Sequence, residues 1–267
     1  MGTSSDFYTS IAEWYDIEHD ALTEDAECFL SLLALPASGR ARILDIGSGT
    51  GRIAVALALG GHEVTCIEPS EAMRTRCAAR LARLPERVAR RVTVLPGRAT
   101  ALGLDTAQRF DTAVLGLHLL GHLTTANERH SALTGIGRQL VSGGQMLVDV
   151  DLLGPRRLYE TARQMWWQGT WQLSERGEEI SHFVTGVAGP TSGMLEVIHF
   201  YDHTTQSGVV RRTAARMSLA MLSRGEVEVA LLRAGYGIEA IYGGYDLTPY
   251  DDGAPRAIFD ARLMADR

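Results

Sequence analysis

A glycine-rich segment between an apolar run and a helical pattern constrains this chain more than any other feature. Residues 43–52 read ILDIGSGTGR, with glycines at positions 47, 49 and 51 directly after a strand-like stretch. Glycine adopts backbone conformations that are closed to other residues, and it lets a ligand lie directly against the chain. The segment therefore predicts a tight strand-to-helix turn beneath a nucleotide-like ligand.

An acidic residue ends the next apolar run, about 20 positions after the glycines. That run, residues 63–67, reads EVTCI, and Glu68 follows it. A carboxylate at this place can accept hydrogen bonds from both hydroxyls of a ribose. The glycines follow the order G-x-G-x-G rather than G-x-G-x-x-G, so the helix has no third glycine in register for a diphosphate. The alternative is a tight turn without a ligand, and the glycines, the acid and the following Met73 together disfavour it.

Together with Asp45, the glycine turn resembles motif I of the class I S-adenosylmethionine (SAM) methyltransferases. Residues 68–73, which read EPSEAM, resemble the second motif of that family. The resemblance implies a Rossmann-like fold, SAM as the cofactor, S-adenosylhomocysteine as its product and methyl transfer as the activity. It also implies that the cofactor contacts Asp45, Gly47, Ser48, Gly49, Gly51, Glu68, Pro69 and Met73.

Strand-like and helical stretches alternate along the first two thirds of the chain, which predicts an α/β fold with a mostly parallel sheet covered by helices on both faces. Strands are expected near 41–46, 63–68, 91–95, 110–115 and 145–151, and helices near 22–35, 50–60, 70–83 and 126–141. Capping boxes at Thr125 and Ser223 predict helix starts, the second helix running to about 234. Strands near 238–242 and 256–264 complete a seven-stranded sheet, and they resemble the terminal hairpin of the methyltransferase sheet.

The pattern changes between about 155 and 220. After a short helix that carries Trp166 and Trp167, three segments rich in β-branched and aromatic residues are separated by turn residues, and they predict an antiparallel lid insertion over the crevice where ligands of parallel sheets bind. These segments are 179–187, 194–202 and 208–219. We therefore expect one domain, residues 1–267, in four parts: an N-terminal helical cap (1–40), a SAM-binding core (41–152), a substrate lid (155–220) and a C-terminal core helix and hairpin (221–267).

The composition of the chain restricts the kinds of molecule with which it is expected to associate. The net charge of −6 argues against a nucleic-acid partner, since phosphate binding needs a basic excess. The start of the chain is not basic, and no apolar run is long enough for a bilayer, so we expect a soluble, cytoplasmic protein without a membrane partner. A homodimer is possible, because a lid hairpin can pair within one chain or across two. Three cysteines without metal or disulfide spacing are expected to be small core residues: Cys28, Cys66 and Cys77.

Further contacts to the cofactor are expected after the third and fourth strands. Arg98 stands where related methyltransferases carry an acid that binds the adenine amino group. Because an Arg offers no acceptor, it either stacks on the base or turns outwards and leaves the backbone of Ala99 to read the ring edge. Leu115 ends the fourth strand, which faces the methyl donor in this family. His118 either touches the cofactor or caps a backbone carbonyl, and a metal site with His122 is disfavoured because no further ligand is near.

Two segments resemble the bacterial amino-sugar N-methyltransferases, a group of small-molecule, natural-product methyltransferases. Residues 121–123, GHL, resemble a segment whose histidine borders the acceptor site, and residues 7–16, FYTSIAEWYD, resemble one that folds over SAM. Tyr8 and Tyr15 are then expected against the sulfonium, which has a cation–π rationale, or they simply form an aromatic staple. His122 or Tyr15 is the predicted catalytic base, needed if the acceptor begins protonated.

The leading hypothesis is methyl transfer to a nitrogen or oxygen of a small molecule in natural-product biosynthesis. Methylation of carbon on an electron-rich ring is an alternative, which would require aromatic walls around the acceptor. A SAM-binding enzyme that catalyses a non-methylating reaction and a non-enzymatic SAM-binding protein are the others. The candidate acceptor-binding residues are Trp166, Trp167, His199, Tyr201 and Arg216, and no metal is expected.

Overall fold

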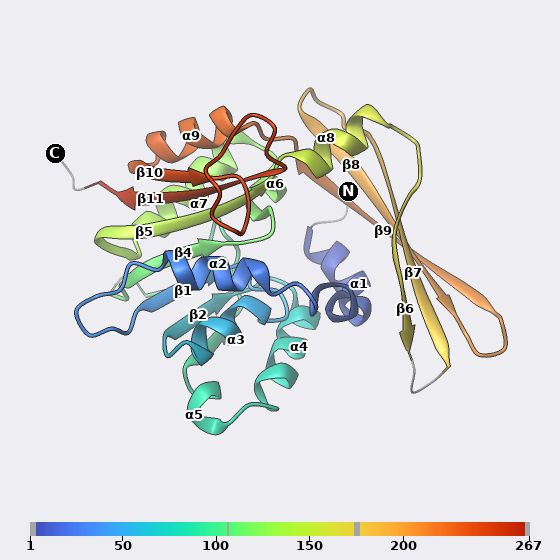
Figure 1. Ribbon diagram of the computed structural model, residues 1–267, viewed down its shortest axis with the longest axis horizontal. Coiled ribbons are helices and arrows are strands. Elements are labelled where there is room, and N and C mark those ends of the chain that lie inside the picture. The colour runs from blue at the N-terminus through green and yellow to red at the C-terminus, as the bar shows by residue number, and fades with distance from the viewer. Residues whose placement is uncertain (1–3, 106, 174–176, 265–267) are drawn as a thin grey trace.

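Two sheets make up the protein in the computed structural model, which describes residues 4–105, 107–173 and 177–264 (Figure 1). The larger sheet has seven strands in the order β10-β11-β5-β4-β1-β2-β3. Neighbouring strands among β1 to β5 pair in parallel, whereas β11 pairs antiparallel with β5 and with β10. The predicted seven-stranded, mostly parallel, Rossmann-like sheet is therefore confirmed. Its strands are β1 (Arg42–Ile46), β2 (Glu63–Ile67), β3 (Val92–Leu95), β4 (Phe110–Leu115), β5 (Leu140–Asp151), β10 (Tyr236–Tyr242) and β11 (Arg256–Leu263).

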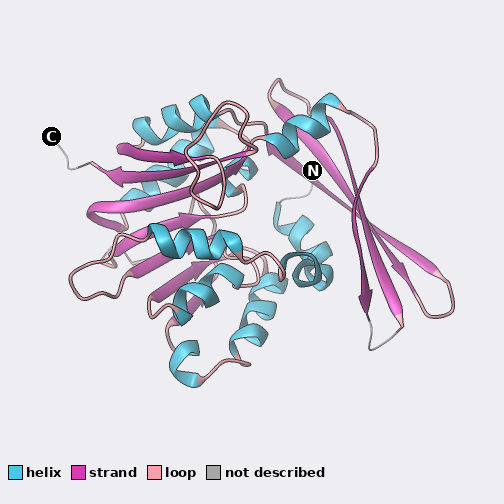
Figure 2. Ribbon diagram, viewed as in Figure 1, coloured by secondary structure: helices cyan, strands magenta, loops and turns pink. Residues whose placement is uncertain are grey.

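Helices cover both faces of this sheet (Figure 2). In β1, Leu44 and Ile46 face an apolar layer formed with α7 (Ala126–Gly137) and α9 (Arg224–Arg233), whereas Ile43 faces a layer formed with α2 (Glu24–Leu32) and α3 (Arg52–Leu59). Because both faces are covered, the central parallel strands are almost entirely apolar, as their sequence runs predict. The capping boxes at Thr125 and Ser223 are both present. The remaining helices of the core are α4 (Glu71–Leu81), α5 (Glu86–Ala89) and α6 (Leu119–His122).

One boundary prediction in the core is wrong. The helix expected to reach residue 141 ends at Gly137, and β5 begins at Leu140 rather than at 145. The cause is a register shift in the pairing with β4, where Phe110 lies opposite Leu140 but Thr112 lies opposite Gln145. The Gly143–Gly144 pair therefore lies within the strand as an irregularity, where it looked like a stop.

The insertion is a separate antiparallel sheet of four strands, one more than expected. Its strands β6 (Trp166–Leu173), β7 (Glu178–Ala188), β8 (Met194–Thr204) and β9 (Val210–Ala220) pair in chain order. Trp166 and Trp167 begin β6 instead of lying in a helix, and the short helix α8 (Leu153–Glu160) ends before them. Pairing with β7 favours the extended form, and aromatic residues readily adopt it.

A long N-terminal helix, α1 (Ser4–His19), lies between the core and the lid sheet (Figure 1). Its apolar side chains pack with lid residues, in a cluster that contains Phe7, Ile11, Trp14, Ile180 and Tyr201. On its other side, Asp16 pairs with Arg76 at 2.8 Å and with Arg80 at 2.7 Å, both on α4. The helix therefore connects the two sheets at the edge where the parallel strands end. None of the helices described is long and apolar enough to cross a membrane.

Candidate functional site

The glycine turn joins β1 to α3 at the carboxyl edge of the sheet. Gly47, Gly49 and Gly51 have φ angles of 68°, 57° and 80°, in the left-handed region that other residues seldom adopt. A Cβ at Gly47 would lie 2.8 Å from Cδ1 of Leu119, and one at Gly51 would collide with Sγ of Cys77. Both conformation and space therefore require glycine, and the backbone at Gly49 remains open towards a ligand.

Glu68 is held beside this turn by backbone groups. Its Oε2 accepts a hydrogen bond from the amide of Gly49 at 3.0 Å, and its Oε1 accepts one from the amide of Ser70 at 2.7 Å. Arg74 donates to the carbonyls of Glu68 and Pro69, each at 2.8 Å, and so fixes the chain after β2. Burial raises the pKa of Glu68, while the two amide bonds act in the opposite direction. A carboxylate oxygen can accept more than one hydrogen bond, so both oxygens retain capacity for ribose hydroxyls.

Two other polar atoms at the turn lack a partner. Oδ2 of Asp45 and Oγ of Ser48 are buried with no hydrogen bond to any residue that the structure describes. Burial raises the pKa of Asp45 to about 7, the charge of Glu68 adds to this, and Arg52 opposes it. An unpaired buried polar atom costs about 1–3 kcal/mol. Acceptors in this state fit a ligand with hydroxyl and ammonium donors, such as a nucleoside with an amino-acid tail.

These groups line a small pocket of about 90 Å³ under α1. Six residues predicted to contact the cofactor do not line it. Met73 and Leu115 are fully buried in the core. Arg98 is exposed and pairs through its backbone with Ala101, so its guanidinium turns outwards, and the adjacent Ala99 packs on the core. The other two absent residues are Gly51 and His118. The lining residues that were predicted from the sequence are Tyr8, Tyr15, Asp45, Gly47, Ser48, Gly49, Glu68 and Pro69.

A larger cavity of about 440 Å³ lies between the core, α1 and the lid. Trp166, His199 and Tyr201 line it from the lid. Trp167 and Arg216 do not, because successive side chains of a strand point to opposite faces and their neighbours Trp166 and Met217 face the cavity. The two pockets share four lining residues, which form the junction between them: Tyr8, Tyr15, Leu117 and His122.

The junction is built around a hydrogen bond between the hydroxyl of Tyr8 and Nε2 of His122, at 3.1 Å. Burial lowers the pKa of His122 to about 3, and His118 contributes in the same direction, so the His122 imidazole is neutral at physiological pH. Burial raises the pKa of Tyr15 above its usual value, although Arg52 opposes this. Its hydroxyl stays protonated and suits a hydrogen-bond donor better than the predicted base.

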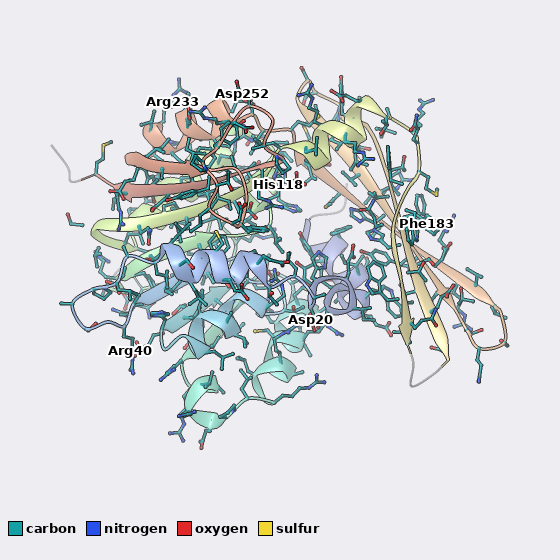
Figure 3. All side chains as sticks on the ribbon, viewed as in Figure 1. Asp20, Arg40, His118, Phe183, Arg233 and Asp252 are labelled. Atoms are coloured by element: carbon teal, nitrogen blue, oxygen red, sulfur yellow. The ribbon has the colours of Figure 1, made fainter. Side chains whose placement is uncertain are left out.

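His118 lies beside this junction, at the end of the core sheet that faces the lid (Figure 3). It lines the larger cavity, not the pocket at the glycine turn. Its Nδ1 accepts a hydrogen bond from the amide of Asp151 at 3.1 Å, and burial lowers the pKa of the ring, against the smaller raising effect of a backbone hydrogen bond with Ala220. Across the described ranges, no group of three His, Cys, Asp or Glu side chains is placed to hold a metal ion.

Sequence reasoning missed Asp149, a buried carboxylate on β5. It accepts hydrogen bonds from the guanidinium of Arg256 at 2.6 Å, the hydroxyl of Tyr245 at 2.8 Å and the amide of Leu117 at 3.2 Å. Leu117 has a φ of 47°, and His118 one of 62°, which are strained values for such residues. Asp149 therefore helps to hold the strained turn at the junction. The sequence feature that could have identified Asp149 is the presence of an acidic residue within the apolar run of β5.

A second missed group is Glu18, which faces the larger cavity from α1. Its Oε1 lies 2.8 Å from Nδ1 of His182, and its Oε2 accepts a hydrogen bond from the hydroxyl of Tyr201 at 3.1 Å. His182 in turn bonds through Nε2 to Nδ1 of His199 at 2.9 Å. No local pattern marks this cluster, because Glu18 and His182 are 164 positions apart in the chain.

A doubly covered parallel sheet, a glycine turn after β1 and a buried acid after β2 together make a doubly wound architecture with a nucleotide-type site at the carboxyl ends of the strands. Comparison with known proteins agrees: residues 43–144 match the family model described as "Methyltransferase domain". A "Putative methyltransferase" of Geobacillus sp. (strain WCH70) is 30% identical over 146 residues, which are 54% of this chain and 57% of that protein. The chain thus matches only a little over half of that relative's length.

Several solved structures share the whole fold. The CcbJ methyltransferase from Streptomyces caelestis has a TM-score of 0.78 at 21% identity, covering 98% of this chain and 99% of CcbJ. The sugar N-methyltransferase KedS8 from Streptoalloteichus sp. ATCC 53650 has 0.70 at 16% identity, with 94% and 93% covered. CalS10, an amino pentose methyltransferase from Micromonospora echinaspora solved with SAM bound, has 0.66 at 20% identity, with 92% and 91% covered.

These findings confirm the resemblance predicted from the sequence. Residues 43–144 match a methyltransferase domain, and the fold is that of solved methyltransferases, one of them with SAM bound. At these identities the likeness to solved structures concerns the fold, including the lid. The roles of individual site residues remain predictions.

Proposed function

We propose that this chain is a SAM-dependent methyltransferase that methylates a nitrogen or oxygen of a small molecule in natural-product biosynthesis. The observation that carries the proposal is the junction of the two pockets. The pocket at the glycine turn and the cavity under the lid meet at Tyr8, Tyr15, Leu117 and His122. A group held in one pocket can therefore reach a molecule held in the other.

The residues of the small pocket suit the parts of SAM. Glu68 offers carboxylate oxygens to the ribose, and Asp45 and Ser48 offer unpaired acceptors. Tyr8 and Tyr15, whose ring centroids are 6.1 Å apart, present aromatic rings to a sulfonium. SAM, when bound, supplies a methyl group on a good leaving group. The protein then needs to align the acceptor and exclude water, which the burial of the junction favours.

The larger cavity has the size and lining of a small-molecule site rather than a polymer groove. At about 440 Å³, it combines aromatic walls with several hydrogen-bonding groups, among them His199 and Asp149. Two relatives with the same fold are named a sugar N-methyltransferase and an amino pentose methyltransferase. We therefore favour an amino sugar or a comparable hydroxylated amine as the acceptor, and no nucleic acid.

The test is incubation of the full chain with SAM and a panel of amino sugars, phenols, hydroxylated polyketides, indoles and amino acids. Mass spectrometry reads S-adenosylhomocysteine and the methylated product together. We expect one amino sugar or hydroxylated amine to gain one methylene with matching S-adenosylhomocysteine. Tight SAM binding without S-adenosylhomocysteine would favour a non-methylating reaction, an indole methylated at carbon would favour the carbon alternative, and failure to bind SAM would overturn the proposal.

His122→Ala tests the junction itself. If His122 serves the acceptor, we expect kcat to fall about 10²-fold with SAM affinity nearly unchanged, because general base catalysis typically contributes 10²- to 10⁴-fold. Equal losses in turnover and SAM affinity would point to a structural role through Tyr8.

A further inference from the structure

We infer that Glu18, His182 and His199 form a proton-accepting chain for the acceptor molecule, with Nε2 of His199 as the atom that contacts it. In this arrangement His199 is a catalytic residue, and His182 and Glu18 position it. The inference rests on the proposed methyl transfer. It adds a second proton acceptor to the predicted His122, on the lid side of the cavity.

The hydrogen bonds fix the tautomers along the chain. An ionised Glu18 only accepts, so Nδ1 of His182 must carry the proton of the 2.8 Å bond. In neutral His182, Nε2 is then an acceptor, and Nδ1 of His199 donates to it across 2.9 Å. The proton of neutral His199 therefore lies on Nδ1, and its Nε2 presents a lone pair.

This lone pair has no partner in the described part of the protein. Nε2 of His199 is buried, and the His199 side chain lines the larger cavity. A buried acceptor without a hydrogen bond is costly, so a molecule with an N–H or O–H group at this place would gain its full hydrogen bond. The cavity thus selects acceptors with a donor group, such as an amine, an ammonium or a hydroxyl.

Packing keeps the imidazoles in place. The ring of His182 stacks on Tyr201, with centroids 4.3 Å apart and planes 4° apart, and lies 5.1 Å from the ring of His199. Phe7 of α1 meets the His199 ring edge-on at 4.9 Å. Tyr201 also donates to the second oxygen of Glu18, so both carboxylate oxygens are oriented. Such second contacts hold a catalytic ring in one orientation.

Electrostatics favours a neutral His199 that gains a proton only during the reaction. Burial lowers the pKa of His199 to about 3, and the neighbouring His182 adds to this, while Glu18 opposes it. An ammonium that enters the same buried cavity loses pKa for the same reason, which brings donor and acceptor closer. Burial alone would raise the pKa of Glu18, but its bond from His182 holds it below the usual value. The titratable groups that face His199 are His182 on β7, Tyr201 on β8, Glu18 and His19 on α1, and His122 on α6.

The step balances without any further reactant. The acceptor nitrogen or oxygen gives its proton to Nε2 of His199, and its freed electron pair forms the new bond to the methyl carbon. The bond from that carbon to sulfur breaks, and its electron pair stays on sulfur. The imidazolium faces Glu18 through His182 until its proton leaves to water.

The first experiment compares His199→Gln and Glu18→Gln with the unmodified full chain. We expect His199→Gln to lower kcat about 10²-fold with SAM affinity unchanged. Glu18→Gln should lower kcat and also move the acid limb of the kcat/KM profile to lower pH, because loss of the carboxylate disfavours the imidazolium. A residue that only maintains the fold would not move that limb.

The matched control is His203→Gln. His203 lies on the same strand, and its Nε2 bonds to Glu178 at 2.9 Å, but it does not line the cavity. We expect this variant to keep both turnover and pH profile. Thermal unfolding and SAM titration of each variant identify any that fail to fold.

The second experiment reads the tautomer without turnover. Long-range proton–nitrogen NMR spectra of the full chain with labelled histidines should show His199 protonated on Nδ1 and bare on Nε2, with loss of this preference in Glu18→Gln. A proton on Nε2 would overturn the inference, as would turnover of His199→Gln within threefold of the unmodified chain. If no acceptor is methylated, the proposed function fails and these spectra decide the chain of hydrogen bonds by themselves.

Discussion

At the residue scale, Glu68 both holds the glycine turn and lines the pocket beside it. The residue is 4% exposed, and its carboxylate accepts hydrogen bonds from the amides of Gly49 and Ser70. We expect Glu68→Ala to weaken SAM binding by about 1–3 kcal/mol, the cost of losing hydrogen bonds to a charged group. Because Glu68→Ala also leaves two amides unpaired, the Tm of this variant should fall. Glu68→Gln keeps one acceptor oxygen, so it should lose less SAM affinity and less thermal stability than Glu68→Ala. Calorimetric titration measures the affinity, and unchanged affinity in Glu68→Ala would contradict the assignment.

The raised pKa of Asp45 makes the stability of the unliganded protein decrease as the pH rises. Burial raises its pKa to about 7 in the folded state, above the unfolded value of 3.8. The stability that a raised pKa contributes is complete below pH 3.8 and is lost as the pH rises through 7. We expect Asp45→Asn to be more stable than the unmodified chain, by a margin that grows to a few kcal/mol (roughly) between pH 4 and 7 and then stays constant. Denaturant titrations across this range measure the difference in stability between the two proteins. A difference that does not change with pH would refute the raised pKa of Asp45.

At the scale of elements, α1 covers the pocket at the glycine turn, to which it contributes Tyr8 and Tyr15. Asp16 anchors it through two arginines of α4, Arg76 and Arg80. We expect Asp16→Ala to raise the dissociation rate of SAM several-fold, because the cover then opens more often. Asp20→Ala is the control, since Asp20 is half exposed and makes one of the ion pairs of Arg80, and such pairs contribute little. Stopped-flow displacement of SAM measures both, and equal rates in the two variants would argue against the anchor.

The elements that could be predicted from the sequence are those that depend on residues close together in the chain. The core strands and the turn at Gly47 follow from runs of neighbouring residues, so the sequence sufficed to locate them. The strand character of Trp166 depends on pairing with Val184 of β7, and the length of β5 depends on a register shift against β4. The same distinction holds for the residues of the site. Glu68 belongs to a local sequence motif and could be predicted, whereas Glu18 approaches His182 only in the folded chain.

At the scale of the whole molecule, α1 couples the core to the lid. Its Phe7, Ile11 and Trp14 pack with Ile180 and Tyr201 of the lid, while its tyrosines line the pocket at the glycine turn. Saturating SAM, at 100 times its Kd, stabilises a protein by about 2.7 kcal/mol. Because α1 contacts both sheets, that stabilisation should extend beyond the pocket.

Hydrogen exchange measured by mass spectrometry tests this coupling. With SAM we expect slower exchange in α1 and at the glycine turn, and also in β7 and β8, which contain two of the lid residues that α1 touches, Ile180 and Tyr201. The outer strand β10 lies at the far edge of the core sheet and should change little. In Asp16→Ala the protection of β7 and β8 should become smaller, while that of the glycine turn persists. The reason is that α1 is then no longer held against the core by the ion pairs of Asp16. Protection confined to the turn in the unmodified chain would show that the lid closes independently, and acceptor binding would then have to order it.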